Sequence, residues 1–126
     1  MNKSNQNFSI LRRIQSFGFA CNGLRILLKE EHNAWIHSIS AIVAIIAGLF
    51  FQITTFEWVS IIFSIGFVIC SELINTAIEN MCDHITLEKH DTIKKIKDLS
   101  AASVFISAIT ALIVGLIVFV PKILSL

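Results

Sequence analysis

The sequence has few residues that would interrupt a helix or cross-link the chain. Its 126 residues include five glycines, one proline and three cysteines. So little glycine and proline leaves no room for a long flexible linker, and we therefore expect a single domain over residues 1–126. The cysteines, at positions 21, 70 and 82, lack the spacing of a metal site. Their odd number argues against a disulfide framework.

Charged residues are also scarce. They make up 15% of the chain, whereas hydrophobic residues make up 55% and the mean hydropathy is +0.77. A soluble domain of this length is rarely so apolar, so the composition predicts a small integral membrane protein. Residues 1–16 are polar and basic with only scattered apolar positions, and we expect no cleavable signal peptide there.

Four segments have the apolar patterns of helices. Residues 8–31 carry apolar side chains at three- and four-residue steps together with basic residues, which predicts an amphipathic helix in the membrane interface. Residues 35–53, 58–79 and 99–120 are long and apolar enough to be transmembrane helices, and residues 80–98 form a polar loop. The predicted fold class is therefore an all-α membrane protein, because helices satisfy every backbone polar group in lipid.

The basic residues predict how the chain is oriented in the membrane. Nine of the ten lysines and arginines lie in the N-terminal region or in the 80–98 loop, and only Lys122 falls on the other side. Cytoplasmic segments carry an excess of lysine and arginine. We therefore expect the N-terminus and the 80–98 loop in the cytoplasm and the C-terminus outside.

The second predicted span ends in a row of polar residues. At 100° per residue, Glu72, Asn75 and Glu79 fall at about 0°, 300° and 340° on one helix face, with Asp83 near 20° if the helix continues. An acidic group at mid-bilayer costs about 2.5–3.5 kcal/mol, so the row implies a function. Counted from Trp58, Glu72 lies roughly 21 Å into a core of about 30 Å, and Glu79 lies at the cytoplasmic boundary.

Further polar residues reach the same cytoplasmic level. Glu31 ends the interfacial helix there, and Lys97-Asp98 open the third span. Glu31 and Glu79 are suited to hold Mg²⁺ with a nucleotide, and Lys97 to contact phosphate oxygens. Glu72 lies deeper and is suited to accept a proton from a lipid hydroxyl. An ion or proton pathway and a structural polar seam remain alternatives on these grounds.

Other local patterns point to packing or surface roles. Gly18 to Gly23 have the glycine spacing of a P-loop, but Leu24-Arg25 stands where Lys-Ser/Thr is required, and small residues for close helix contact explain it better. His37, at the start of the first span, is interpreted as a packed or interfacial residue. The lysines of residues 94–97 predict a solvated surface facing anionic lipid.

The polar row also carries a resemblance to a known family. The run Glu72-Leu-Ile-Asn75-Thr-Ala-Ile-Glu79, followed by Asp83 and Lys97-Asp98, resembles the prokaryotic diacylglycerol kinase family, which includes the undecaprenol kinases. Further matches lie upstream, at Asn22-Gly23-Leu24, Glu31-His32-Asn33 and Glu57-Trp58. The resemblance extends from about residue 17 to residue 121.

The resemblance implies a homotrimer with composite sites that transfers phosphate from Mg-ATP to a lipid alcohol, at the cytoplasmic face of the bacterial inner membrane. It implies that Glu72 is the catalytic base and Asn75 an orienting amide. It implies that Glu31 and Glu79 bind the metal and the ATP phosphates. The nucleotide-contacting residues that it implies are Arg12, Phe19, Glu31, Glu79, Glu88, His90, Lys97 and Asp98.

Two departures from the family pattern are visible. Trp35 stands where many members have a basic residue, and we expect it to be an interface anchor. Lys89 interrupts the usual Glu-Tyr-His of the loop. The sequence of residues 75–79 and 31–33 is more similar to the undecaprenol kinase branch. Diacylglycerol and undecaprenol both offer a primary hydroxyl, so the chemistry of the reaction does not distinguish these two substrates. A non-enzymatic membrane protein with a polar seam for assembly or ion passage is the alternative function.

Overall fold

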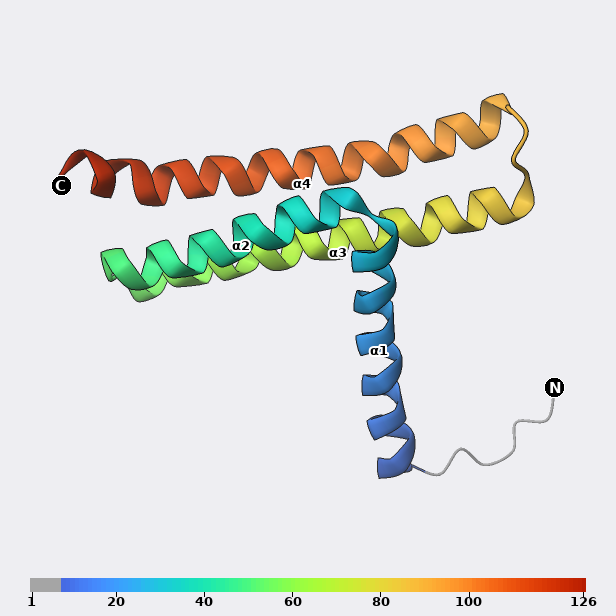
Figure 1. The fold of residues 1–126 in the computed structure, drawn as a ribbon, viewed down its shortest axis with the longest axis horizontal. Helices are drawn as coiled ribbons and strands as arrows, with labels where there is room; N and C mark the ends of the chain where they lie inside the picture. Colours follow the sequence, from blue (N-terminus) through green and yellow to red (C-terminus); the bar gives the residue numbers. More distant parts are fainter. Residues whose placement is uncertain (1–7) are drawn as a thin grey trace.

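The computed structural model describes residues 8–126, so the first seven residues of the expected domain lie outside the described part. Four helices follow one another: α1 (Ile10–Glu30), α2 (His32–Phe51), α3 (Thr55–Ile85) and α4 (Asp91–Leu124). No strand occurs in the described residues. In Figure 1, α2, α3 and α4 run alongside one another, and α1 projects away from them. The predicted all-α architecture, with three apolar helices long enough to cross a membrane, is confirmed.

The two longest helices extend well past a hydrocarbon core. At 1.5 Å per residue, the 20 residues of α2 cover about 30 Å, whereas the 31 residues of α3 and the 34 of α4 cover about 46 Å and 51 Å. A hydrocarbon core is about 30 Å thick. The predicted loop over residues 80–98 is much shorter in the structure. Only residues 86–90 connect α3 to α4. α4 also continues through Pro121, beyond the expected end at residue 120.

Local interactions explain why the 80–98 segment is mostly helical. The His90 side chain caps α4, where its Nδ1 accepts a hydrogen bond from the Thr92 backbone N–H at 3.2 Å. One turn further on, Lys94 Nζ lies 2.5 Å from the Asp98 carboxylate in an i,i+4 pair. Such caps and pairs stabilise a helix end that projects into water.

The turn between α2 and α3 is short and fully hydrogen-bonded. Thr54 and Glu57 form a capping box, in which the Glu57 N–H donates to Thr54 Oγ1 at 3.2 Å and the Thr54 N–H donates to Glu57 Oε2 at 2.8 Å. Gln52 ends α2 in the left-handed region, with φ 51°. A Cβ on Gly48 would lie only 2.7 Å from the Trp58 ring, so glycine allows α2 and α3 to approach closely here.

Two ion pairs set the register of the antiparallel helices α3 and α4. Lys97 lies 2.5 Å from Asp83, and Lys122 lies 3.2 Å from Glu57. The two carboxylates are 26 positions apart on α3 (57 to 83), which corresponds to about 39 Å of helix. This exceeds a hydrocarbon core of about 30 Å, so the separation is long enough to place the two pairs on opposite sides of that core.

Several small polar side chains of α3 and α4 are buried. The hydroxyls of Ser64 and Ser71 donate to backbone carbonyls of α3, and the hydroxyl of the fully buried Ser107 donates to a carbonyl of α4. Small residues of this kind let membrane helices pack closely. Large apolar side chains gather instead near the Thr54 end of α3, where Ile53, Ile61 and Val118 form the buried core.

Candidate active site

The polar row of α3 has the arrangement that the sequence predicts. α3 continues to Ile85, so Glu72, Asn75, Glu79 and Asp83 share one helix face. Glu72 is only 2% exposed and Asn75 7%, whereas Glu79 is half-buried and Asp83 is exposed. The row therefore runs from a deeply buried carboxylate to one in contact with water.

His37 is the neighbour of Glu72 across the helix interface. Its Nε2 lies 3.1 Å from Glu72 Oε1, and its side chain is 22% exposed. The distance is that of an ion pair, but no donor within residues 8–126 is oriented for a regular hydrogen bond to Oε1. The sequence interpretation of His37 as a packed or interfacial residue missed this contact. His37 lies six positions after Glu31, about 9 Å along α2, which is the depth below the boundary predicted for Glu72.

Other buried polar atoms lie close to Glu72 in the sequence of α3 or on the facing helix. Asn75 Oδ1, Thr76 Oγ1 and Ser100 Oγ are buried and have no hydrogen-bond partner among the described residues. Leaving such an atom unsatisfied costs about 1–3 kcal/mol. Thr76 and Ser100 were not singled out from the sequence. These atoms leave hydrogen-bonding capacity unused near Glu72 within the described chain.

Glu31 and Glu79 form a second acidic cluster nearer the helix ends. Glu31 is the single non-helical residue between α1 and α2, and its N–H donates to the Leu27 carbonyl at 3.0 Å. Its carboxyl group contacts that of Glu79. Burial raises the pKa of Glu31 above its ordinary value, and Glu79 raises it further through a hydrogen bond and its charge.

This pair has the composition of a magnesium site. Two adjacent carboxylates repel one another unless a proton or a cation lies between them. Mg²⁺ commonly uses one or two carboxylates and completes its shell with phosphates and water. In the described chain no three acidic, histidine or cysteine side chains form a metal-binding group, so Glu31 and Glu79 alone are the carboxylates that this cluster offers to a metal ion.

Two side-chain hydrogen bonds hold the end of α1 beside this cluster. Asn80 Nδ2 donates to Glu30 Oε2 at 2.9 Å, and Trp35 Nε1 donates to the Leu28 carbonyl at 2.7 Å. Carbonyls in the last turn of a helix lack an intrahelical partner, so the Trp35 indole stabilises this end of α1. Trp35 therefore has a bracing role beyond the interface anchor that we expected from the sequence.

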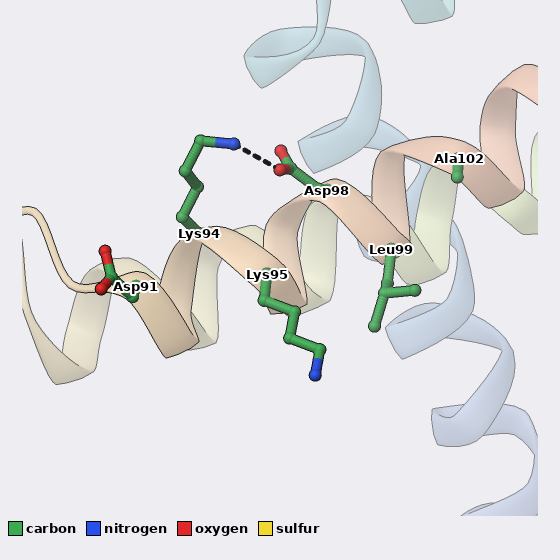
Figure 2. Close-up of a pocket in the computed structure, with 6 residues that line it drawn as sticks. All are labelled: Asp91, Lys94, Lys95, Asp98, Leu99 and Ala102. Carbon is green, nitrogen blue, oxygen red and sulfur yellow. Dashed lines mark hydrogen bonds and ion pairs between the residues drawn. The ribbon is translucent and has the colours of Figure 1, made fainter.

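The structure separates Lys97 and Asp98, which the sequence grouped as one pair. Lys97 pairs with Asp83 on α3 and lies in the field of Glu79, so it faces the polar row. Asp98 pairs instead with Lys94 on the exposed surface of α4, and Figure 2 shows this pair beside a shallow pocket of about 480 Å³. Lys95 points away from the pair in the same view.

Four of the predicted nucleotide-contacting residues lie apart from the acidic cluster. Arg12 and Phe19 are exposed on α1, about 28 Å and 18 Å along the helix from Glu31. Glu88 and His90 are exposed in the loop beyond the end of α3. Within a single chain Arg12 and Phe19 are therefore far from Glu31, and the hydrogen bonds of Glu88 and His90 in the described residues are local to their own segment.

An apolar groove runs along the three long helices. It has a volume of about 660 Å³ and is lined by residues of α2, α3 and α4. His37, Ser40 and Ser64 are its polar residues, and Phe119 and Ile123 lie toward the C-terminal end of α4. His37 borders the groove directly, whereas the buried Glu72 does not.

Comparison with known proteins identifies the family. A family model described as prokaryotic diacylglycerol kinase matches residues 18–119. The chain belongs to this family. Its relatives include the undecaprenol kinase of Bacillus subtilis, 33% identical over 97% of this chain and 99% of the relative. The diacylglycerol kinase of Escherichia coli K12 is 27% identical over 87% and 90% of the two chains, and that of Haemophilus influenzae is 32% identical over 84% and 91%.

Membership in the prokaryotic diacylglycerol kinase family confirms the resemblance inferred from the sequence. The chain is accordingly a lipid kinase, a phosphotransferase with an alcohol acceptor, and an integral membrane protein of bacteria. A kinase of this family draws its phosphoryl group from a nucleotide. The enzyme is thus favoured over the non-enzymatic polar seam.

Proposed function

We propose that this kinase transfers the γ-phosphate of Mg-ATP to the primary hydroxyl of a polyprenyl or diacylglycerol lipid at the cytoplasmic membrane interface. Undecaprenol is the acceptor that we favour, since the undecaprenol kinase of Bacillus subtilis aligns over nearly the whole of both chains. The observation that carries the proposal is the polar face of α3, which joins the buried Glu72 to the Glu31–Glu79 pair.

The acceptor half of the reaction is assigned to the buried end of this face. Glu72 accepts the proton of the lipid hydroxyl as its oxygen attacks the γ-phosphorus and the bond to the bridging oxygen of ADP breaks. Asn75, one turn away and with an unpartnered Oδ1, orients the reacting groups. The depth of Glu72 in an apolar span supports this role, because a lipid hydroxyl reaches that level without leaving the membrane.

The donor half is assigned to the shallower end. Glu31 and Glu79 would hold Mg²⁺, which supplies charge neutralisation to the nucleotide phosphates when bound. Lys97 faces the same row and meets phosphate oxygens after giving up part of its contact with Asp83. The remaining nucleotide contacts are assigned to the residues that a single chain leaves exposed: Arg12, Phe19, Glu88, His90 and Asp98.

The separation of these residues supports a shared site between subunits. We assign a homotrimer in which a neighbouring copy contributes the exposed contacts that one chain cannot bring to Glu31 and Glu79. We also assign the N-terminus and the 86–90 connection to the cytoplasm and the C-terminus to the outside. The concentration of lysine and arginine at the former ends supports this orientation.

The proposal is tested by phosphorylation assays on the purified protein in mixed micelles with Mg-ATP. We expect phosphorylation of undecaprenol to exceed that of diacylglycerol in side-by-side reactions. Glu72→Gln should lower the turnover by about 10²- to 10⁴-fold, because the general base is lost. The exposed Asp91→Asn is the matched control and should retain activity.

Three results would count against the proposal. Full activity of Glu72→Gln, with an unchanged oligomer on size exclusion, would remove Glu72 from the role of base. Preference for diacylglycerol would overturn the choice of acceptor alone. Absence of phosphorylation with every lipid alcohol, together with an ion flux in liposomes, would support the polar-seam alternative.

A further inference from the structure

We infer that His37 is a positioning residue for Glu72, holding one carboxylate oxygen so that the other faces the lipid hydroxyl. The inference rests on the proposed function, since it assumes that Glu72 is the general base. Its structural basis is the contact of 3.1 Å between His37 Nε2 and Glu72 Oε1, which joins α2 to α3.

His37 is the one side chain in the described chain that lies at ion-pair distance from Glu72. A carboxylate that is 2% exposed in an apolar span needs a donor, because an unpartnered buried charge is strongly disfavoured. No polar group of its own helix forms a hydrogen bond with it in the described chain, and Asn75 Oδ1 and Thr76 Oγ1 themselves lack partners. The imidazole therefore carries the support of this carboxylate.

The contact also gives the two carboxylate oxygens different tasks. His37 approaches Oε1, which leaves Oε2 as the oxygen that takes the proton. An ion-pair contact from the neighbouring helix restricts rotation of the Glu72 side chain and keeps it in a reactive orientation.

The position of His37 beside the apolar groove strengthens the inference. His37 borders this groove and also contacts Glu72, which itself does not line the groove, so one side chain touches both. The helix-to-helix contact also ties the geometry of the base to the packing of α2 against α3. A change at His37 should therefore act on the chemical step and leave nucleotide binding at Glu31 and Glu79 untouched.

The test compares three variants of the full-length protein in mixed micelles, with Mg-ATP and the lipid alcohol that the wild type phosphorylates best. His37→Leu replaces the imidazole with an apolar side chain of similar size. We expect kcat to fall about 10- to 100-fold, the range typical of a group that orients a functional ligand. The KM for Mg-ATP should change by less than about twofold. His37→Gln places an amide nitrogen near the position of Nε2 and should restore most of kcat.

A double-mutant comparison separates positioning from a general structural role. In the Glu72→Gln background, His37→Leu should cause no further loss of kcat, because the group that it positions is already gone. An equal loss in both backgrounds would overturn the inference. His84→Leu, at an exposed histidine near the end of α3, is the control and should leave kcat unchanged.

The remaining outcomes are also decisive. If the wild type phosphorylates a lipid alcohol and folded His37→Leu retains wild-type kcat, this inference fails and the proposed function stands. If the wild type phosphorylates none, both fail. If His37→Leu does not fold, as judged by size exclusion and thermal unfolding, His37→Gln is compared with His37→Asn, whose shorter amide does not reach Oε1. Equal kcat in those two variants overturns the inference.

Discussion

The two ends of α3 contrast in how well their polar groups are satisfied. At the Thr54 end, Glu57 completes a capping box and pairs with Lys122 next to the apolar core of Ile53, Ile61 and Val118. Between Glu72 and Asp83, at the Asp83 end, buried polar atoms lack partners and carboxylates lie side by side.

The contrast separates stability from function within one helix. The interactions at the Thr54 end are those that stabilise a folded protein, since Thr54, Glu57 and Lys122 have polar partners and apolar side chains are buried beside them. The Asp83 end has unpartnered buried polar atoms and adjacent carboxylates, which are destabilising features that concentrate at functional sites. Substitutions at the two ends should therefore have opposite effects on activity and stability.

Among the substitutions that test this contrast, the largest effect is expected from Glu79→Gln at the Asp83 end. It removes one of the two carboxylates of the proposed magnesium site and should lower kinase activity by about 100-fold at limiting Mg²⁺. The free energy of unfolding of the metal-free protein should stay the same or rise, because repulsion with Glu31 is relieved. Activity assays over a Mg²⁺ titration measure the first effect and thermal unfolding in chelator the second. Glu57→Gln, an acid at the Thr54 end, is the control; an equal activity loss there would erase the contrast.

Gly48→Ala tests the Thr54 end. The added Cβ would meet the Trp58 ring at 2.7 Å, so we expect a loss of about 1–3 kcal/mol in the free energy of unfolding from overpacking. The specific activity of the folded fraction should not change. Gly66→Ala is the matched control, since nothing lies within 4 Å of its Cβ, and it should be neutral or stabilising. Equal thermal unfolding of the two variants would contradict the close packing of Gly48 against Trp58.

Glu31 predicts a pH dependence of stability in the metal-free protein. Its pKa is raised above the ordinary value of 4.5, so the folded state binds the proton more tightly than the unfolded state. Stability should therefore be highest below the ordinary pKa and fall as pH rises through the raised one. Thermal unfolding across this range in chelator measures the slope. Glu31→Gln should flatten it while Asp91→Asn should not, and a slope that survives in Glu31→Gln would assign it to another group.

The smallest effect is expected from Lys122→Gln. The Lys122–Glu57 pair is partly exposed, with side chains 26% and 27% accessible. Surface pairs of this kind contribute about 0.2–1 kcal/mol, so thermal unfolding should shift only slightly and activity should persist. Loss of activity comparable to that of Glu79→Gln would show that the Thr54 end takes part in function.

The sequence was sufficient for features that depend on periodicity and length. The shared face of Glu72, Asn75, Glu79 and Asp83 follows from 100° per residue, and the three apolar helices follow from their hydrophobic runs. The 80–98 loop was wrong because polarity alone does not distinguish a loop from a helix that extends into water.

Features that depend on the rotation of one helix against another could not be derived in this way. The polar residues of α2 are confined to its first half and do not mark which side faces α3, so the contact of His37 with Glu72 was missed. Matching the depths of polar residues on neighbouring spans was the signal that could have found it. The indole hydrogen bond of Trp35 likewise depends on the sharp corner at Glu31.

The two ion pairs of the α3–α4 hairpin have a mechanical consequence. Charges about 39 Å apart on α3 favour the headgroup regions of both leaflets, so the hairpin resists sliding along the membrane normal. α2 has only 20 residues and no such pair at its two ends in the described chain. We therefore expect hydrophobic mismatch in a thinner or thicker bilayer to change the tilt of α2 more than that of the hairpin. Because α2 carries His37, a change in its tilt should alter the contact between His37 and Glu72, and bilayer thickness should thereby affect the orientation of this carboxylate.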